Sequence, residues 1–233
     1  MTELVLQRLL GPDSLPATLR EADLPQAYAW PATPTVRANF VASLDGSIAG
    51  ADGLSGSLGN EADHAVFFTL RRSCDAIVVG AGTARAENYG PPPTGAVLVL
   101  VSRSGDIPER LASHPSVILA TGETGARRAG AGVPMEAERI WTLGDEEVPA
   151  KAVRERLVAE GRTRILHEGG PGLLATWLAA GCVNELCLTR VPRLLGGGRG
   201  LLPAPVGDLR LSPELLLETG GTLLGWWALP RQD

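Results

Sequence analysis

The sequence has few cysteines, few aromatic residues and no excess of basic residues. It holds 3 cysteines, Cys74, Cys182 and Cys187, in 233 residues, and aromatic residues make up 4% of the chain. An odd number of cysteines without paired spacing argues against a disulfide framework and favours a reducing compartment. The net charge of −5 gives no support to nucleic-acid binding, which needs a basic face.

Long hydrophobic runs and metal-binding motifs are also missing. No apolar run approaches the ~20 residues that a membrane span needs, and no cysteine–histidine cluster has the spacing of a zinc site. The N-terminal stretch MTELVLQRLLGPDSLP does not have the charged, apolar and cleavage regions of a signal peptide. We therefore expect a cytoplasmic protein with no membrane partner and no metal.

The pattern that is present predicts one α/β domain. Residues 1–35 are rich in proline and predict an irregular N-terminal arm, and residues 36–233 predict a single regular domain. Short apolar runs such as DAIVVG, AVLVLVS and SVILAT are typical of buried parallel strands. They alternate with helical stretches, including EADHAVFFTLRRSC, PAKAVRERLVAEG and GLLATWLAAG. The segment GETGARRAGAGVPMEAE is expected to be a loop.

The end of the chain predicts an antiparallel pair. The runs DLRLSPELLLE and TLLGWWAL flank TGG, which is typical of a hairpin. The expected fold is therefore α/β, with about eight strands in a mostly parallel central sheet and the C-terminal hairpin at its edge.

Three glycine-bearing turns follow apolar strands: SLDGSIAGADGLSGS, VVGAGTARAENYG and HEGGPGLLATWL. Ligands of open α/β sheets bind outside the carboxyl ends of the strands, and a helix N-terminus suits phosphate. Two such turns suit a dinucleotide pyrophosphate, although each turn alone is explained equally well by the tight turns of the fold. The Rossmann fingerprint and the P-loop are missing.

Four motifs occur in the order of a known family: FVASLDGSIAG, LRRSCDAIVVGAGTARAENYGPP, ILHEGGPGLLATWLAAGCVNELCLTRVPRLLGGG and the terminal hairpin. Together they closely resemble the C-terminal reductase domain of the bifunctional riboflavin-biosynthesis protein, over about residues 36–229. The stretch LPQAYAWP resembles the free-standing pyrimidine reductase branch of actinobacteria. The resemblance implies a dihydrofolate reductase-like fold with helices on both faces of the sheet, and a homodimer.

The resemblance also implies NADPH as cofactor, lying across the strand ends. Thr83 would bind a cofactor phosphate, and Ser102 and Arg103 would meet the 2′-phosphate, where a guanidinium favours NADPH over NADH. Arg103 is explained equally well as a solvated loop residue. The implied cofactor-binding set is Val41, Ser57, Gly80, Gly82, Thr83, Glu87, Ser102, Arg103, Gly169, Gly170, Pro171, Gly172 and Leu173.

For the substrate, the resemblance implies that Ser55, Arg71 and Glu168 contact an amino-pyrimidine or similar ring. The resemblance implies that Glu168 is also catalytic, although its carboxylate is explained too by the dipole of the following helix. Asp45 is expected to be either catalytic or a residue that stabilises its own turn. The implied chemistry is hydride transfer from nicotinamide C4 to C1′ of a ring-opened ribosylamine. The sequence offers no unambiguous general acid, so water is expected to supply the proton.

Two departures from the family leave the substrate open. Ser47 stands where relatives usually have Lys or Arg, and ENYGPPPTG replaces a stretch that ends in a basic residue. Both missing cations are candidate partners of a ribose phosphate. Three functions therefore remain: a reductase of riboflavin-type pyrimidines, a reductase of dihydrofolate or another pterin-like compound, and a non-catalytic NADPH-binding protein.

Overall fold

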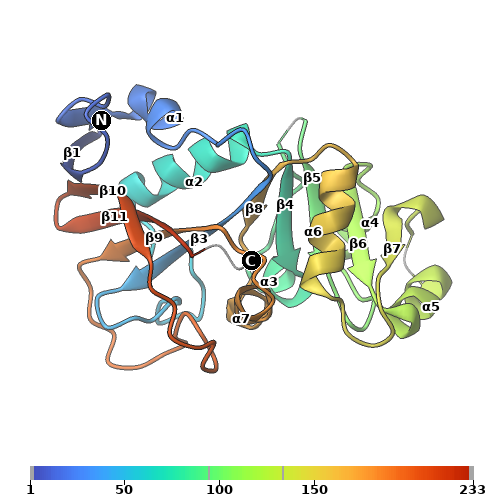
Figure 1. The fold of residues 1–233 in the computed structure, drawn as a ribbon. Coiled ribbons are helices and arrows are strands. Elements are labelled where there is room, and N and C mark those ends of the chain that lie inside the picture. The colour runs from blue at the N-terminus through green and yellow to red at the C-terminus, as the bar shows by residue number, and fades with distance from the viewer. Residues whose placement is uncertain (1–2, 94, 133, 231–233) are drawn as a thin grey trace.

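One continuous sheet runs through the computed structural model, which describes residues 3–93, 95–132 and 134–230 (Figure 1). Within those residues the sheet has 11 strands. The strands are β1 Val5–Leu10, β2 Thr18–Arg20, β3 Thr35–Ser43, β4 Ala76–Gly80, β5 Val97–Val101, β6 Val117–Thr121, β7 Ile140–Thr142, β8 Arg164–His167, β9 Glu185–Val191, β10 Ser212–Thr219 and β11 Thr222–Ala228.

The sheet has a parallel part and an antiparallel part. Its strand order is β2-β1-β10-β11-β9-β3-β8-β4-β5-β6-β7. All pairings from β9 to β7 are parallel, and those among β2, β1, β10, β11 and β9 are antiparallel. The expected α/β class, the mostly parallel centre and the C-terminal hairpin β10–β11 are confirmed. The parallel strands bring their carboxyl ends to one edge, where ligands of such sheets bind.

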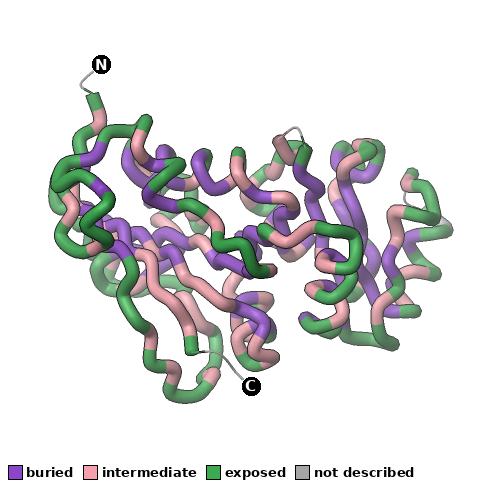
Figure 2. Tube along the Cα trace, turned by 45° about the horizontal axis from the view of Figure 1, so that its top comes forward, coloured by how far each residue is buried: buried purple, intermediate pink, exposed green. Residues whose placement is uncertain are grey.

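Helices cover both faces of the sheet, as the resemblance implies. The helices are α1 Leu24–Ala27, α2 Glu61–Ser73, α3 Ala81–Ala86, α4 Glu109–Ala112, α5 Glu123–Gly132, α6 Ala150–Ala159 and α7 Pro171–Ala179, with 3-10 turns at Glu21–Asp23 and Ala137–Arg139. One apolar core contains α2 to α5 and the N-terminal arm, and the other contains α6 and α7. Figure 2 shows burial concentrated in the central strands. None of the helices described has the length and apolarity needed to cross a membrane.

Helix α2 forms one wall of the candidate site. The Asn60 side chain caps it by accepting a hydrogen bond from the Asp63 amide at 3.1 Å. Its buried stripe, which includes Ala62, Val66 and Leu70, packs on the sheet. The helix therefore has a fixed register over the strands, and its remaining inward side chains have defined positions.

Two expectations about local structure are wrong. The described part of the N-terminal arm, residues 3–35, is not wholly irregular, because β1 and β2 extend the sheet beyond the hairpin, which is consequently not at the edge. The segment expected to be a loop contains α5, Glu123–Gly132. Its three glycines lower helix propensity, yet Ala129 is buried in the core, so tertiary packing outweighs propensity here.

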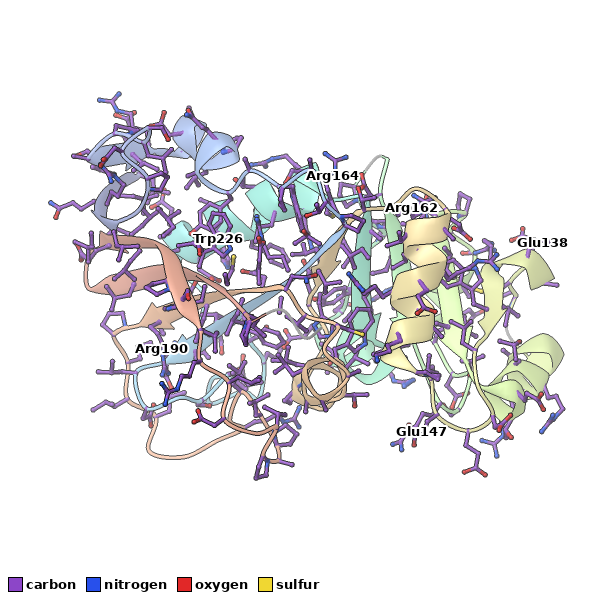
Figure 3. All side chains as sticks on the ribbon, in the orientation of Figure 1. Glu138, Glu147, Arg162, Arg164, Arg190 and Trp226 are labelled. Carbon is purple, nitrogen blue, oxygen red and sulfur yellow. The ribbon has the colours of Figure 1, made fainter. Side chains whose placement is uncertain are left out.

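Arg37 on β3 fastens the N-terminal arm to the sheet. Its fully buried guanidinium lies 4.4 Å from the ring centroid of Trp30 and 4.6 Å from that of Trp226, which is labelled in Figure 3. The same group pairs with Glu185 at 2.6 Å and donates to the Tyr28 carbonyl at 2.7 Å. A buried arginine held by two rings, a carboxylate and a carbonyl gives the arm one docked position.

Candidate functional site

A cavity of about 410 Å³ opens at the carboxyl ends of the parallel strands. The strand β3 forms its floor, α2 and α3 form its walls, and the turns after β4 and β8 close one side. It is lined by Asn39, Phe40, Val41, Ile48, Ala49, Gly53, Ser55, Gly56, Asp63, His64, Phe67, Phe68, Arg71, Gly82, Thr83, Ala86, Glu87, Asn88, Tyr89, Gly90, Glu168, Gly170, Pro171 and Arg199. Its size and its mixture of apolar and convergent polar groups suit a small-molecule site.

Glu168 and Arg71 form a bidentate ion pair in this cavity. Arg71 donates from Nε to Oε1 of Glu168 at 2.8 Å and from Nη2 to Oε2 at 2.6 Å. The Tyr89 hydroxyl donates to Oε2 at 2.9 Å. The Glu168 side chain is only 2% exposed and the Arg71 side chain 16%. The structure thus brings together two of the three residues expected at the substrate, Arg71 and Glu168, and adds a tyrosine.

Aromatic rings and burial reinforce this cluster. The Arg71 guanidinium lies 4.3 Å from the ring centroid of Phe67 and 4.9 Å from that of Tyr89. Burial lowers the pKa of Arg71, but the hydrogen bonds and charge of Glu168 outweigh that effect and raise it. Burial, followed by the Glu168 charge, raises the pKa of the Tyr89 phenol. Arg71 stays a cation and Tyr89 a neutral donor at physiological pH.

The two expected phosphate-binding turns meet beside the cavity. Gly170 has φ +65°, and a Cβ there would lie 2.5 Å from Oγ1 of Thr83. A Cβ on Gly169 would lie 2.8 Å from the Cα of Val79. Glycine is therefore required at both positions, by conformation at Gly170 and by close packing at Gly169.

Other glycines of the same turns leave room for a ligand. A Cβ on Gly82 or Gly172 would meet nothing within 4 Å, and one on Gly80 would meet only a carbonyl at 3.7 Å. Open space beside backbone at the start of α3 and α7 fits the phosphates of a dinucleotide. Pro171 also lines the cavity, whereas Leu173 packs into the core beneath it. No group of metal-ligating side chains occurs among the residues that the structure describes.

The loop between β3 and α2 reaches the cavity through Ser55. Its backbone N–H donates to Oε1 of Glu87 at 2.7 Å, so Glu87 supports this loop. Ser57 does not line the cavity; its hydroxyl donates to Asp52 at 2.7 Å, and its carbonyl accepts from Arg193. Val41, at the end of β3, does line the cavity. The binding roles assigned to these residues stay predictions.

Asp45 lies in a turn beside the cavity rather than among its lining residues. Its carboxylate accepts from the Ser43 hydroxyl at 2.6 Å and from the amide of Gly196 at 2.8 Å, and it also accepts from the amide of Leu195. The Ser43 bond, followed by the Gly196 amide, lowers the pKa of Asp45. This geometry favours the second of the two expected roles, in which Asp45 joins its own turn to the glycine-rich loop after β9.

Ser102 and Arg103 follow β5 and do not line the cavity. The Ser102 hydroxyl donates to the Asp106 carbonyl at 3.0 Å. Arg103 pairs with Glu147 at 3.0 Å, and both side chains are 74% exposed. Figure 3 labels Glu147, which lies at the edge of the sheet where the parallel strands end. The Arg103 guanidinium is therefore accessible, with one weak surface partner.

Sequence reasoning missed several polar residues of the cavity, among them Asn39, Asp63, Tyr89 and Arg199. Asn39 interrupts the apolar residues of β3, and a polar residue within a buried strand was the one available signal. Asp63 resembles an ordinary first-turn acid of a helix. Tyr89 and Arg199 lie in glycine- or proline-rich loops, whose paths no local pattern predicts.

His167 immediately precedes Glu168 but faces the opposite core. It is fully buried, and its ring centroid lies 5.2 Å from that of Trp177 and 6.4 Å from that of Phe40. Neither ring nitrogen has a hydrogen-bond partner within the described part of the chain. Burial lowers the pKa of His167 to about 3. The imidazole is therefore neutral at physiological pH, and its role in the structure is packing.

Comparison with known proteins identifies relatives. A protein of Methanothermobacter thermautotrophicus, 2,5-diamino-6-ribosylamino-4(3H)-pyrimidinone 5′-phosphate reductase, is 30% identical over 175 residues, which cover 70% of this chain and 80% of that protein. The chloroplastic riboflavin biosynthesis protein PYRR of Arabidopsis thaliana is 26% identical over 182 residues, covering 73% of this chain. The chain spans only 29% of the Arabidopsis protein.

A solved structure agrees with these relatives. The pyrimidine reductase-like protein of Corynebacterium diphtheriae superimposes with a TM-score of 0.75 at 26% identity, covering 92% of this chain and all of that one. The model of the RibD C-terminal domain family matches residues 34–226, which include β3, α2, both glycine turns and Glu168. The resemblance of the four sequence motifs is thereby confirmed, and the chain belongs to the RibD C-terminal domain family.

Proposed function

We propose that the chain is an NADPH-dependent reductase of a riboflavin-type ribosylamino-pyrimidine. The observation that carries this proposal is the Glu168–Arg71–Tyr89 cluster, which lies in the cavity next to the paired glycine turns. The family match and the pyrimidinone reductase activity of the Methanothermobacter relative support a pyrimidine over a pterin as the substrate.

The residues of the two turns would hold the cofactor. The backbone N–H groups of Gly82 and Gly172, with the Thr83 hydroxyl, are available to the pyrophosphate, since both glycines leave space for it. Val41 would face the nicotinamide from the end of β3. The bound nicotinamide supplies a hydride, which is the chemistry that no side chain can provide.

The cluster of Glu168, Arg71 and Tyr89 would recognise the pyrimidine within the same cavity. Glu168 offers carboxylate oxygens to ring N–H or amino groups, and Arg71 and Tyr89 offer donors to ring carbonyls. Their mutual bonds fix all three side chains before the substrate binds, which lowers the entropic cost of ordering them. Phe67 adds an aromatic face beside Arg71. The protein's contribution is then to orient the substrate carbon and to exclude water.

A cofactor titration combined with turnover tests this function. We expect micromolar NADPH binding by fluorescence quenching and consumption of one NADPH per ribosylamino-pyrimidine phosphate reduced, identified by mass spectrometry of the ribitylamino product. Dihydrofolate serves as the competing substrate. NADPH binding without any turnover would support the non-catalytic alternative, and turnover with dihydrofolate alone would support the pterin alternative.

We further propose that Arg103 gives the preference for NADPH over NADH. It is the exposed guanidinium next to the end of β5, and its present partner Glu147 is equally exposed, so a dianionic phosphate can replace it. Arg103→Ala should weaken NADPH binding and leave NADH binding unchanged, with Arg127→Ala on exposed α5 as the matched control. Equal losses for both cofactors would contradict this role.

A homodimer remains a proposal. Exposed apolar side chains of β1, namely Val5, Leu9 and Leu10, support it, because such residues gathered on one strand favour contact with another surface. Sedimentation of the wild type and of Leu9→Glu measures the oligomeric state. A monomeric wild type would refute the dimer.

We also propose a cytoplasmic location. The three cysteines are free and buried in the described structure, as expected where thiols remain reduced. Fractionation of cells that express the full chain tests this location, and recovery in a membrane or secreted fraction would contradict it.

A further inference from the structure

The helix α2 presents a third functional side chain to the cavity, one turn beyond the aromatic residue that stacks on Arg71. Asp63, Phe67 and Arg71 follow one another at intervals of four residues, which places them on one face of the helix. All three line the cavity. Asp63 and Arg71 are about 12 Å apart along the helix axis, at roughly 1.5 Å per residue.

The strand register places Asp63 near the end of β3, where the nicotinamide is expected. Thr189 on β9 is the direct cross-strand partner of Val41, and the side chain of Thr189 acts on the Asp63 carboxyl by lowering its pKa. The carboxyl therefore lies one strand away from the residue expected to face the hydride donor. Glu168 lies on the opposite side of β3, at the end of β8.

The surroundings of Asp63 favour an uncharged acid. The residue is 8% exposed, and it forms no salt bridge within the described part of the chain. Burial raises its pKa, while Thr189 and His64 act in the opposite direction. The Asp63 carboxyl in turn contributes, after burial and Cys187, to the raised pKa of the buried Tyr28 phenol. The backbone of Gly59 packs so closely that a Cβ there would lie 2.8 Å from Oδ2.

The other carboxylates of the cavity are already engaged. Glu168 accepts three hydrogen bonds from Arg71 and Tyr89, and Glu87 accepts the Ser55 amide. Asp63 is not needed as a helix cap either, because Asn60 performs that role. Glu61 already supplies an exposed negative charge to the same helix turn.

We propose that Asp63 is the catalytic acid that completes the reduction. The inference rests on the proposed function. Reducing a carbon–nitrogen double bond consumes one hydride and one proton: the hydride brings its electron pair to carbon, and the O–H bond of Asp63 breaks as an N–H bond forms on the substrate. Water entering the open cavity then reprotonates the carboxylate. A positioned acid of this kind typically contributes a factor of about 10² to 10⁴ in rate.

The test compares Asp63→Asn with Glu61→Gln, which makes the same carboxyl-to-amide change in the same helix turn at an exposed position. We expect Asp63→Asn to lower kcat by roughly 100-fold or more, with KM and NADPH affinity unchanged. Because the acid must be protonated, wild-type kcat should fall as pH rises through the raised pKa of Asp63. That fall should vanish in Asp63→Asn and persist in Glu61→Gln. Formate should partly restore the rate of Asp63→Ala.

A second measurement does not depend on turnover or on a folded variant. Carbon NMR of the unliganded wild-type protein follows the Asp63 carboxyl, which should titrate above the range of an ordinary aspartate. A value at or below that range would overturn the proposal. So would a wild-type rate and pH profile in Asp63→Asn. A wild type that reduces no ribosylamino-pyrimidine would instead refute the proposed function itself, and the Asp63 role with it.

Discussion

His167 and Glu168 are consecutive residues at the end of β8, and both are buried polar side chains. Glu168 faces α2, where Arg71 and Tyr89 donate three hydrogen bonds to it. His167 faces α7, where it lies among apolar and aromatic side chains with both ring nitrogens unbonded. Successive residues of a strand face opposite sides of a sheet. One face of the strand end therefore presents hydrogen-bonded polar groups to a cavity, and the other packs into the core.

The contrast shows why burial alone does not identify a functional group. A buried polar side chain is costly unless it is paired. Glu168 is paired with the Arg71 guanidinium in an accessible cavity. His167 has no partner, and burial suppresses its charge instead. Partners and access to a cavity, more than residue type, make Glu168 the better candidate for a functional residue.

The largest expected effect comes from breaking the ion pair between Arg71 and Glu168. Arg71→Met leaves the nearly buried Glu168 carboxylate without its cation, which should lower the free energy of unfolding by about 3 kcal/mol. Adding Glu168→Gln removes the unpaired charge and should recover at least about 1 kcal/mol. Urea unfolding of the wild type, both single variants and the double variant measures this coupling. Additive effects would show that the pair is not a unit.

Gly170→Val should have the next largest effect, because it strains the turn that joins β8 to α7. The substitution places a branched side chain at φ +65° and against the Thr83 hydroxyl. We expect a loss of about 2–3 kcal/mol in unfolding free energy and weaker NADPH binding. Gly172→Ala is the control, since its added methyl group meets nothing within 4 Å. If the two variants have equal melting temperatures and equal NADPH affinities, the proposed role of the Gly170 turn in holding the cofactor is wrong.

A change of pH tests the unpaired residue, His167, through its effect on the free energy of unfolding. The folded-state pKa of His167 is about 3, below its unfolded value of 6.5, so the unfolded chain binds more protons in that interval. Stability should therefore fall as pH falls below 6.5, by about 2 kcal/mol from this residue at pH 5. His167→Leu should remove that contribution. An unchanged difference between urea midpoints at pH 7 and pH 5 in this variant would refute the assignment.

The smallest expected effect concerns Asp45. Its carboxylate holds the amides of Leu195 and Gly196 and does not line the cavity. Asp45→Asn should lower kcat by roughly ten-fold at most, because an amide oxygen still accepts from the same donors. Steady-state kinetics measures the change. A loss as large as that of a cavity residue would instead make Asp45 catalytic.

The sequence predicted the central strands well, because runs such as AIVVG and VLVLV have the continuous apolar pattern of buried parallel strands. It failed at β1 and at α5. The strand β1 has three largely exposed apolar residues instead of an alternating pattern. The helix α5 contains glycines that weaken its local signal. In both cases the structure depends on tertiary contacts that a local pattern does not encode.

The site residues, too, could be predicted from sequence only where a local pattern reveals them. Motifs within one turn, such as Gly169 and Gly170 or Gly82 and Thr83, could be recognised from sequence, and the structure places those turns together. The ion pair of Arg71 and Glu168 joins residues 97 positions apart, and only the resemblance suggested both. Asp63, Asn39 and Tyr89 were missed because each looks ordinary in its own segment. Their common cavity is a property of the folded chain.

The central claim is that the paired face of β8 recognises the substrate of a hydride transfer. A single-turnover experiment with NADPH-loaded protein and the ribosylamino-pyrimidine phosphate tests it most directly, with Glu168→Gln beside the wild type. We predict unchanged NADPH affinity in Glu168→Gln and a rate of nicotinamide oxidation that is roughly 100-fold lower. A Glu168→Gln variant that oxidises NADPH as fast as the wild type would contradict the claim.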